Sequence, residues 1–225
     1  MASLLITRLR FAAILLASVF TAQPALCQPS GLRLLIFGDS LATGFDLPEQ
    51  AGFTHVLARR LRADGYANVE VIDGSVDGSR TADAAKRLES SPDEYKADVI
   101  IVELGGNDML IKDSPENIAR NLNWIISGFK ARGARVILGG MLAKPEYGFA
   151  YNVQFDRIYP ALAARWGASL YPFFLQGVYG HPGLMQSDHI HPNAAGVERM
   201  VAGILPLVER NLDAAARRRV ARAPR

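Results

Sequence analysis

The sequence of 225 residues contains a single cysteine, Cys27. One thiol forms no internal disulfide and builds no cysteine-based metal site, so both are excluded for the folded part. The chain also lacks an apolar run of bilayer-spanning length, because its most apolar stretch, residues 11–20, has about half of what a membrane helix needs. Neither G-x-G-x-x-G nor the G-K-[ST] of a phosphate-binding loop occurs, which argues against a nucleotide or phosphate binder.

The short apolar stretch is typical of an export signal rather than of a membrane span. Arg8 and Arg10 precede it, and Ala25 and Cys27 occupy the small-residue positions for cleavage after Cys27. Cleavage after Ala25 and an uncleaved N-terminal anchor are the alternatives. We therefore predict a signal peptide over residues 1–27, a periplasmic or secreted protein, and no stable membrane span after its removal. Export of a core without disulfides suits a bacterial periplasm.

The basic excess of the chain comes from its two ends, and the rest is slightly acidic. The formal net charge is +3, but removing Arg8, Arg10 and the five arginines of residues 214–225 leaves 18 basic against 22 acidic residues. A basic terminus is most simply a frayed, solvated end. We expect residues 214–225 to be a disordered basic tail, and we expect no nucleic-acid partner.

Five apolar runs of strand length recur along the chain, separated by helical patterns. They cover residues 32–37, 68–73, 97–105, 134–140 and 168–173. Continuous Val, Ile and Leu runs indicate strands that are covered on both faces, as in parallel sheets. The sequence therefore predicts an α/β fold, a three-layer α/β/α sandwich whose five-stranded parallel sheet has the flavodoxin-like strand order 2-1-3-4-5. One domain, residues 30–213, accounts for the whole pattern.

The helices between these strands have recognisable ends. Residues 53–65 have helical spacing and stop at Gly65, and residues 114–133 begin at Ser114 and Pro115 and close at Gly133. Ser91 followed by Pro92 and Glu94 predicts a further short helix in "SPDEYK". The last helix is expected from about Pro192 to Asp213.

Polar motifs follow the predicted strands where the strands end. "GDSL" (38–41) follows the first strand, "DGSVDGSRT" (73–81, containing Gly78) the second and "GGND" (105–108) the third, while "SDHIHP" (187–192) precedes the last helix. Open parallel sheets bind ligands beyond the carboxyl ends of their strands. We therefore expect these segments to converge on one edge of the sheet.

Together the motifs contain the groups that acyl transfer requires. Ser40 is the candidate nucleophile, His191 the candidate base, and Asp188, three residues earlier, is placed to orient the imidazole. The oxyanion donors are the N–H of Ser40, the N–H of Gly78 and the amide of Asn107. Taken singly, each residue has a structural alternative, such as Ser40 capping a helix or Asp188 and His191 capping the chain before Pro192.

These four ordered blocks resemble the SGNH or GDSL hydrolase family, with similarity over residues 32–212. The stretches "GGNDMLIKDSPENIARNL", "YNVQFDRIYPALA" and "YPFFLQGVYGHPGLMQSDHIHPN" resemble in particular its bacterial periplasmic branch, described as acyl-CoA thioesterase, lysophospholipase and arylesterase. The resemblance implies that Ser40, Asp188 and His191 form the catalytic triad, that Ser40, Gly78 and Asn107 form the oxyanion hole, and that no metal or cofactor is needed.

The predicted substrate is a small-molecule ester or thioester, hydrolysed through an acyl-enzyme on Ser40 by a protein expected to be a monomer. Apolar side chains beside the motifs are the candidate substrate-binding residues, with ordinary core packing as their alternative: Leu110, Ile111, Leu142 and Tyr147. A carbohydrate O-deacetylase or an acyltransferase with the same triad is the other functional hypothesis.

Overall fold

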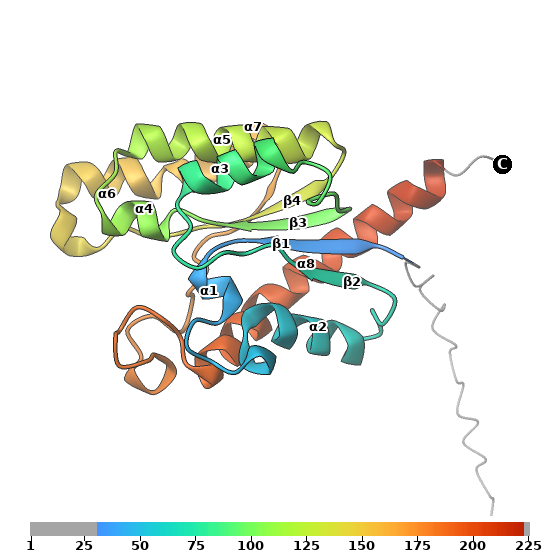
Figure 1. The fold of residues 1–225 in the computed structure, drawn as a ribbon, viewed down its shortest axis with the longest axis horizontal. Helices are drawn as coiled ribbons and strands as arrows, with labels where there is room; N and C mark the ends of the chain where they lie inside the picture. Colours follow the sequence, from blue (N-terminus) through green and yellow to red (C-terminus); the bar gives the residue numbers. More distant parts are fainter. Residues whose placement is uncertain (1–30, 223–225) are drawn as a thin grey trace, which may run out of the picture.

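The computed structural model describes residues 31–222, and Figure 1 shows one sheet between two layers of helices. The strands are β1 (Arg33–Phe37), β2 (Glu70–Asp73), β3 (Val99–Glu103), β4 (Arg135–Gly139) and β5 (Ser169–Tyr171). They pair in the order β2-β1-β3-β4-β5, and every pair is parallel. This confirms the predicted strand order. The predicted signal peptide, residues 1–27, lies outside the described residues.

Long helices cover both faces of the sheet. They are α2 (Phe53–Ala63), α3 (Thr81–Ser90), α5 (Pro115–Ala131), α7 (Ile158–Trp166) and α8 (Ala194–Arg222). Helix α5 packs against α3 and α7 on one face, and α2 packs against α8 on the other (Figure 1). The expected three-layer sandwich is therefore present.

Short helices gather at the edge where the strands end. These are α1 (Ser40–Thr43), α4 (Gly106–Leu110) and α6 (Phe149–Asp156), together with single 3-10 turns at Glu49–Ala51, Pro145–Tyr147 and Pro182–Leu184. In Figure 1 this edge lies on the left, where α1 follows β1 and α4 lies in the same region. The chain thus builds its irregular segments where the polar motifs were expected to meet.

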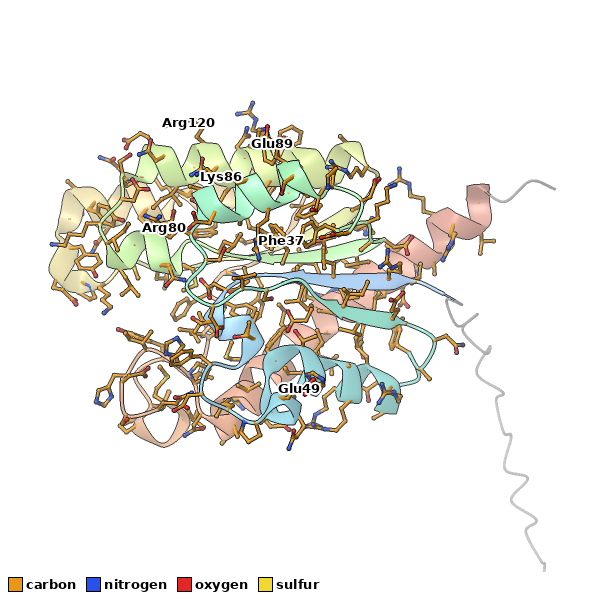
Figure 2. All side chains as sticks on the ribbon, viewed as in Figure 1. Phe37, Glu49, Arg80, Lys86, Glu89 and Arg120 are labelled. Carbon is orange, nitrogen blue, oxygen red and sulfur yellow. The ribbon has the colours of Figure 1, made fainter. Side chains whose placement is uncertain are left out.

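The apolar runs of β1, β3 and β4 form the core of the sheet because both of their faces are covered. All five residues of β3 are buried, and β1 and β4 are buried except for their first residues. Figure 2 shows Phe37 inside, between the sheet and a helix layer, while Arg120 points outward from α5. Glu103, the last residue of β3, is 0% exposed, so one carboxyl group lies within this core.

Helix α5 begins where the sequence predicts. The Ser114 side chain accepts a hydrogen bond from the Asn117 N–H, and Pro115 occupies the first turn. The helix ends at Ala131, and Gly133 then adopts a left-handed conformation with φ of 85°. The cap and the terminating glycine thus fix the helix that covers the middle of the sheet.

The helix predicted in "SPDEYK" is absent. The Glu94 N–H donates to the Ser91 carbonyl at 3.2 Å, so the segment makes turns instead. The chain enters β3 at Val99, which leaves too few residues to offset the cost of nucleating a helix.

The expected boundary at Asp213, with a disordered tail after it, is wrong as far as the structure extends. Helix α8 continues to Arg222, Ala215 is buried, and the Arg218 guanidinium donates to the Gly133 carbonyl at 3.1 Å. Three consecutive alanines have the highest intrinsic helix propensity, so the helix continues once its next turn finds a packing surface. None of the helices within residues 31–222 combines the length and apolar character needed to cross a membrane.

Candidate active site

The turn after β1 presents Ser40 at the first position of helix α1. Asp39, not Ser40, caps this helix, because its Oδ1 accepts a hydrogen bond from the Leu41 N–H at 3.0 Å. The Ser40 hydroxyl is therefore left available for another partner. A Cβ added to Gly38 would lie 2.9 Å from Glu103 Oε2, so this position in the turn has no room for a side chain.

Ser40, His191 and Asp188 form one chain of hydrogen bonds. Ser40 Oγ lies 2.9 Å from His191 Nε2, and His191 Nδ1 lies 2.6 Å from Asp188 Oδ2. The neutral imidazole with its proton on Nδ1 donates to Asp188 and leaves Nε2 to accept the Ser40 hydroxyl proton. The structure thus brings together the three residues predicted as a triad.

The carboxylate of Asp188 is held in its ionised form. Partial burial by itself raises its pKa, but hydrogen bonds from the His191 ring and from the N–H groups of His191 and Ile190 outweigh burial and lower the pKa to about 2. The same bonds tie the carboxylate to the turn that carries the imidazole. Asp188 therefore fixes the orientation of the His191 ring.

The loop bearing His191 is anchored to the loop bearing Ser40. The Phe45 ring stacks on the His191 ring with centroids 4.5 Å apart, and Gln186 Nε2 donates to the Phe45 carbonyl at 2.7 Å. The Gln186 N–H also donates to the His191 carbonyl at 2.8 Å. These contacts hold together two segments that are about 150 residues apart in the sequence.

The predicted oxyanion donors lie along the same edge of the sheet, but only one of them already donates hydrogen bonds within residues 31–222. The N–H groups of Ser40 and Gly78 donate to no acceptor within the described residues. The Asn107 amide is engaged, since its Nδ2 donates to Asp39 Oδ2 at 2.9 Å and to the Ser79 carbonyl at 3.2 Å. Asn107 thereby links the turns after β1, β2 and β3.

A pair of buried carboxyl groups, Asp39 and Glu103, lies beneath the nucleophile. Burial raises the pKa of Asp39 to about 6, although hydrogen bonds from the Leu41 N–H, Glu103 and Asn107 act in the opposite direction. Burial, together with the charge of Asp39, raises the pKa of Glu103 well above its usual range. Glu103 Oε2 accepts the Asp39 N–H at 3.3 Å, so the two carboxyl groups lie side by side and their titrations are linked. Sequence reasoning had not assigned a role to either residue.

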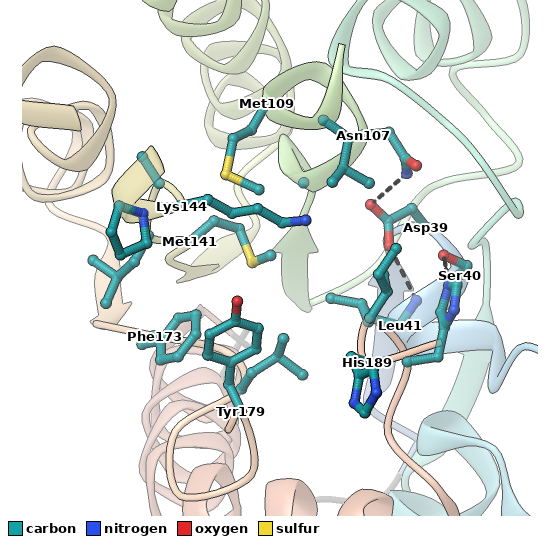
Figure 3. Close-up of a pocket in the computed structure, with 18 residues that line it drawn as sticks. Asp39, Ser40, Leu41, Asn107, Met109, Met141, Lys144, Phe173, Tyr179 and His189 are labelled. Carbon is teal, nitrogen blue, oxygen red and sulfur yellow. Dashed lines mark hydrogen bonds between the residues drawn. The ribbon is translucent and has the colours of Figure 1, made fainter. Parts of the chain in front are cut away.

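An apolar cavity of about 310 Å³ opens beside Ser40 and His191 (Figure 3). Of the predicted substrate-binding residues, Leu110 and Leu142 line it. Ile111 and Tyr147 do not: Ile111 is 58% exposed, and Tyr147 packs against Tyr151. Sequence reasoning missed further lining residues, which come from loops whose course it did not indicate: Lys144, Phe173, Leu175, Tyr179 and Ile190.

A serine hydroxyl bonded to an imidazole that a carboxylate orients can attack a carbonyl carbon. The adjacent cavity suits an apolar acyl or aryl group. Among the residues that the structure describes, no group of three or more His, Cys, Asp and Glu side chains is arranged to hold a metal ion. Fold and site together define the class of serine-dependent ester hydrolases.

Comparison with known proteins agrees with this class. The GDSL-like lipase/acylhydrolase family matches residues 36–199, and the chain belongs to this family, also called the SGNH hydrolases. The chain is 36% identical to esterase TesA of Pseudomonas aeruginosa over 86% of its own length and 94% of that protein. A crystal structure of TesA superposes with a TM-score of 0.75 at 36% identity, covering 80% of this chain and 99% of that one.

Other relatives bear different names. The arylesterase of Vibrio mimicus is 37% identical over 71% of this chain and 80% of that protein. The thioesterase 1/protease 1/lysophospholipase L1 of Escherichia coli K12 is 34% identical over 71% of this chain and 75% of that protein. The protein is thus an SGNH ester hydrolase whose relatives are named for several kinds of ester bond.

Proposed function

We propose that the protein hydrolyses acyl or aryl esters, including lysophospholipids, acyl thioesters and short aryl esters, through an acyl-enzyme on Ser40. The observation that carries this proposal is the continuous hydrogen-bonded chain from Ser40 Oγ through His191 to Asp188. The apolar cavity beside it supports an acyl or aryl substrate over a sugar. The names of the relatives support the same range of bonds.

The reaction has two halves. In the first, Ser40 Oγ bonds to the carbonyl carbon while His191 Nε2 takes the hydroxyl proton; the C–O or C–S bond then breaks, and His191 returns the proton to the leaving alcohol or thiol. In the second, His191 takes a proton from water, the hydroxide attacks the acyl-enzyme, and Ser40 leaves with the proton from His191. Asp188 stabilises the imidazolium in both halves.

The oxyanion formed in each half accepts hydrogen bonds from the N–H groups of Ser40 and Gly78, which have no internal acceptor in the described part of the chain. Asn107 supplies the third. Asn107 Nδ2 already donates two hydrogen bonds in the free protein. When substrate binds, the longer of them, to the Ser79 carbonyl, is shared with the substrate oxygen or replaced by a hydrogen bond to it. Catalytic hydrogen bonds commonly tighten in this way when substrate binds.

Active-site labelling tests the proposal directly. A fluorophosphonate probe should attach to Ser40 in the native protein, should fail to attach in Ser40→Ala, and should react far more slowly in His191→Ala. Ser75→Ala is the matched control, since Ser75 lies in the neighbouring loop and its hydroxyl lies 3.5 Å from the Ile36 carbonyl, away from the triad. Labelling that persists in Ser40→Ala, as mapped by mass spectrometry of the modified peptide, would disprove the assignment of the nucleophile.

A further inference from the structure

One lysine side chain extends into the mostly apolar cavity. Lys144 lies in the loop between β4 and the Pro145–Tyr147 turn, is half-buried, and lines the cavity. Figure 3 shows its side chain extended inward, with the ammonium group directed toward the side where Asp39 and Leu41 lie. Met109, Met141 and Phe173 line the same cavity.

The ammonium group of Lys144 has no internal counter-charge. Within residues 31–222 it forms neither an ion pair nor a hydrogen bond. The nearby carboxylate of Asp39 is only 1% exposed, and both of its oxygens accept hydrogen bonds, one from the Leu41 N–H and one from Asn107. Asp39 therefore serves the turn beneath Ser40 rather than Lys144.

The next lysine along the same edge of the sheet is arranged differently. The Lys112 ammonium lies 4.9 Å from the centroid of the Tyr147 ring, and neither residue lines the cavity. Lys112 thus has an aromatic partner outside the cavity, whereas Lys144 extends into the cavity with none. A lysine close to the active site therefore does not necessarily enter the cavity, and the position of Lys144 is particular to that residue.

A half-buried cation with apolar neighbours interacts strongly with an anion brought to it, because few water molecules compete for either charge. We propose that Lys144 binds a carboxylate or phosphate group on the part of the substrate that occupies this cavity. The enzyme would then select esters carrying such an anionic group over neutral esters of the same size. This inference rests on the proposed function, since it names a substrate class for that same site.

The anionic group has two possible sources, the acyl part or the alcohol part of the ester. Monoesters of dicarboxylic acids represent the first, and lysophospholipids, whose phosphate belongs to the alcohol part, represent the second. Two matched pairs of probes separate them. The para-nitrophenyl monoester of glutaric acid is compared with para-nitrophenyl methyl glutarate, and para-carboxyphenyl butyrate is compared with its methyl carboxylate.

For each pair, the ratio of kcat/KM for the anionic ester to that for the neutral ester is measured in native protein and variants. Lys144→Met should lower this ratio roughly 10- to 100-fold in at least one pair, as expected for the loss of a hydrogen bond between charged groups. Lys144→Arg should retain most of the selectivity. Lys112→Met, the matched control, should leave the ratio unchanged. Lys144→Gln provides a second neutral variant if Lys144→Met does not fold.

The outcomes separate the two proposals. If the native protein hydrolyses none of the four esters, the proposed function fails. If it hydrolyses them and the ratio in Lys144→Met equals the native ratio in both pairs, the inference about Lys144 fails while the proposed function stands. An equal loss in Lys112→Met also overturns it, because the effect then reflects general surface charge. A loss confined to one pair supports the inference and assigns the anion to the acyl or the alcohol part.

Discussion

At the scale of single residues, Asn107 combines two tasks that a substitution affects together. Its amide holds the turns after β1 and β2 and is the proposed side-chain donor to the oxyanion. Asn107→Ala should lower kcat for para-nitrophenyl butyrate roughly 100- to 1,000-fold, as for other lost oxyanion donors. Asn123→Ala is the control, since Asn123 accepts a hydrogen bond from Trp166 away from the site. A kcat within a few-fold of native, in a protein with native melting temperature, would remove Asn107 from the mechanism.

The buried pair of Asp39 and Glu103 makes a prediction about stability and pH. Both have folded-state pKa values above those of the unfolded chain, so folding favours their protonated forms. Their contribution to the free energy of unfolding is fully present below about pH 4 and is lost as pH rises through the raised pKa values. Stability attributable to the pair should therefore decrease from pH 5 to pH 8.

Glu103→Gln tests this, because it removes one proton-binding group and keeps the size of the side chain. The slope of unfolding free energy against pH should become shallower by up to about 1.4 kcal/mol per pH unit between pH 5 and pH 8. Urea denaturation at several pH values measures it, with the exposed Glu89→Gln on α3 as control. Parallel curves for native protein and Glu103→Gln would show that Glu103 does not titrate as inferred.

Residue patterns revealed some site members and not others. Asp188 and His191 were predictable because they are three residues apart and their contact is local. Ser40 was predictable because it directly follows an apolar run of strand length. Glu103 is a lone carboxyl at the end of the apolar run "VIIVE", a pattern from which a buried carboxyl group could have been predicted. Phe45 and Lys144 carried none, since their positions depend on the course of loops. For the same reason Ile111, next to the lining residue Leu110, and Tyr147, two residues after the lining residue Pro145, lie outside the cavity lining.

At the scale of elements, strands were more predictable than helix ends. A parallel strand with both faces buried is apolar along nearly its whole length, so β1, β3 and β4 were visible without tertiary information. The edge strands β2 and β5 are only partly buried. The segment after Ser91 has residues that could cap a helix but is too short to form one. Residues 214–222 are rich in arginine, but they also have a surface to pack against, so the helix continues through them. In both cases tertiary context, which the local sequence does not contain, decided the outcome.

The extension of α8 predicts that residues 214–222 stabilise the domain. Deleting residues 214–225 removes buried Ala215 and the hydrogen bond from Arg218 to the Gly133 carbonyl. The loss should be about 1–2 kcal/mol, or roughly 2–8 °C in melting temperature for a domain of this size. Deleting only residues 223–225 is the control. Equal melting temperatures for the two deletions, measured by scanning calorimetry, would contradict a stabilising role.

At the scale of the whole molecule, the sheet brings distant segments to one edge and leaves a cavity of limited size there. Ser40 and His191 are 151 residues apart in the chain and meet because β1 is an interior strand, between β2 and β3, and the segment before α8 returns beside it. The cavity of about 310 Å³ corresponds to about ten groups of water size, at about 30 Å³ each. We therefore expect the enzyme to prefer acyl chains of short to medium length.

Kinetics on straight-chain esters of one alcohol measure this limit. Each added methylene buried in the cavity contributes about 0.8 kcal/mol, or about a fourfold rise in kcat/KM, until the cavity is filled. We expect kcat/KM for para-nitrophenyl esters to rise steeply from acetyl toward octanoyl and to level off at about ten carbons. Leu110→Trp, which fills the cavity, should shorten the preferred chain, and Ile111→Ala, outside the lining, should not. Highest kcat/KM for the acetyl ester would instead favour the O-deacetylase hypothesis, because a sugar acetate has no acyl chain to bury.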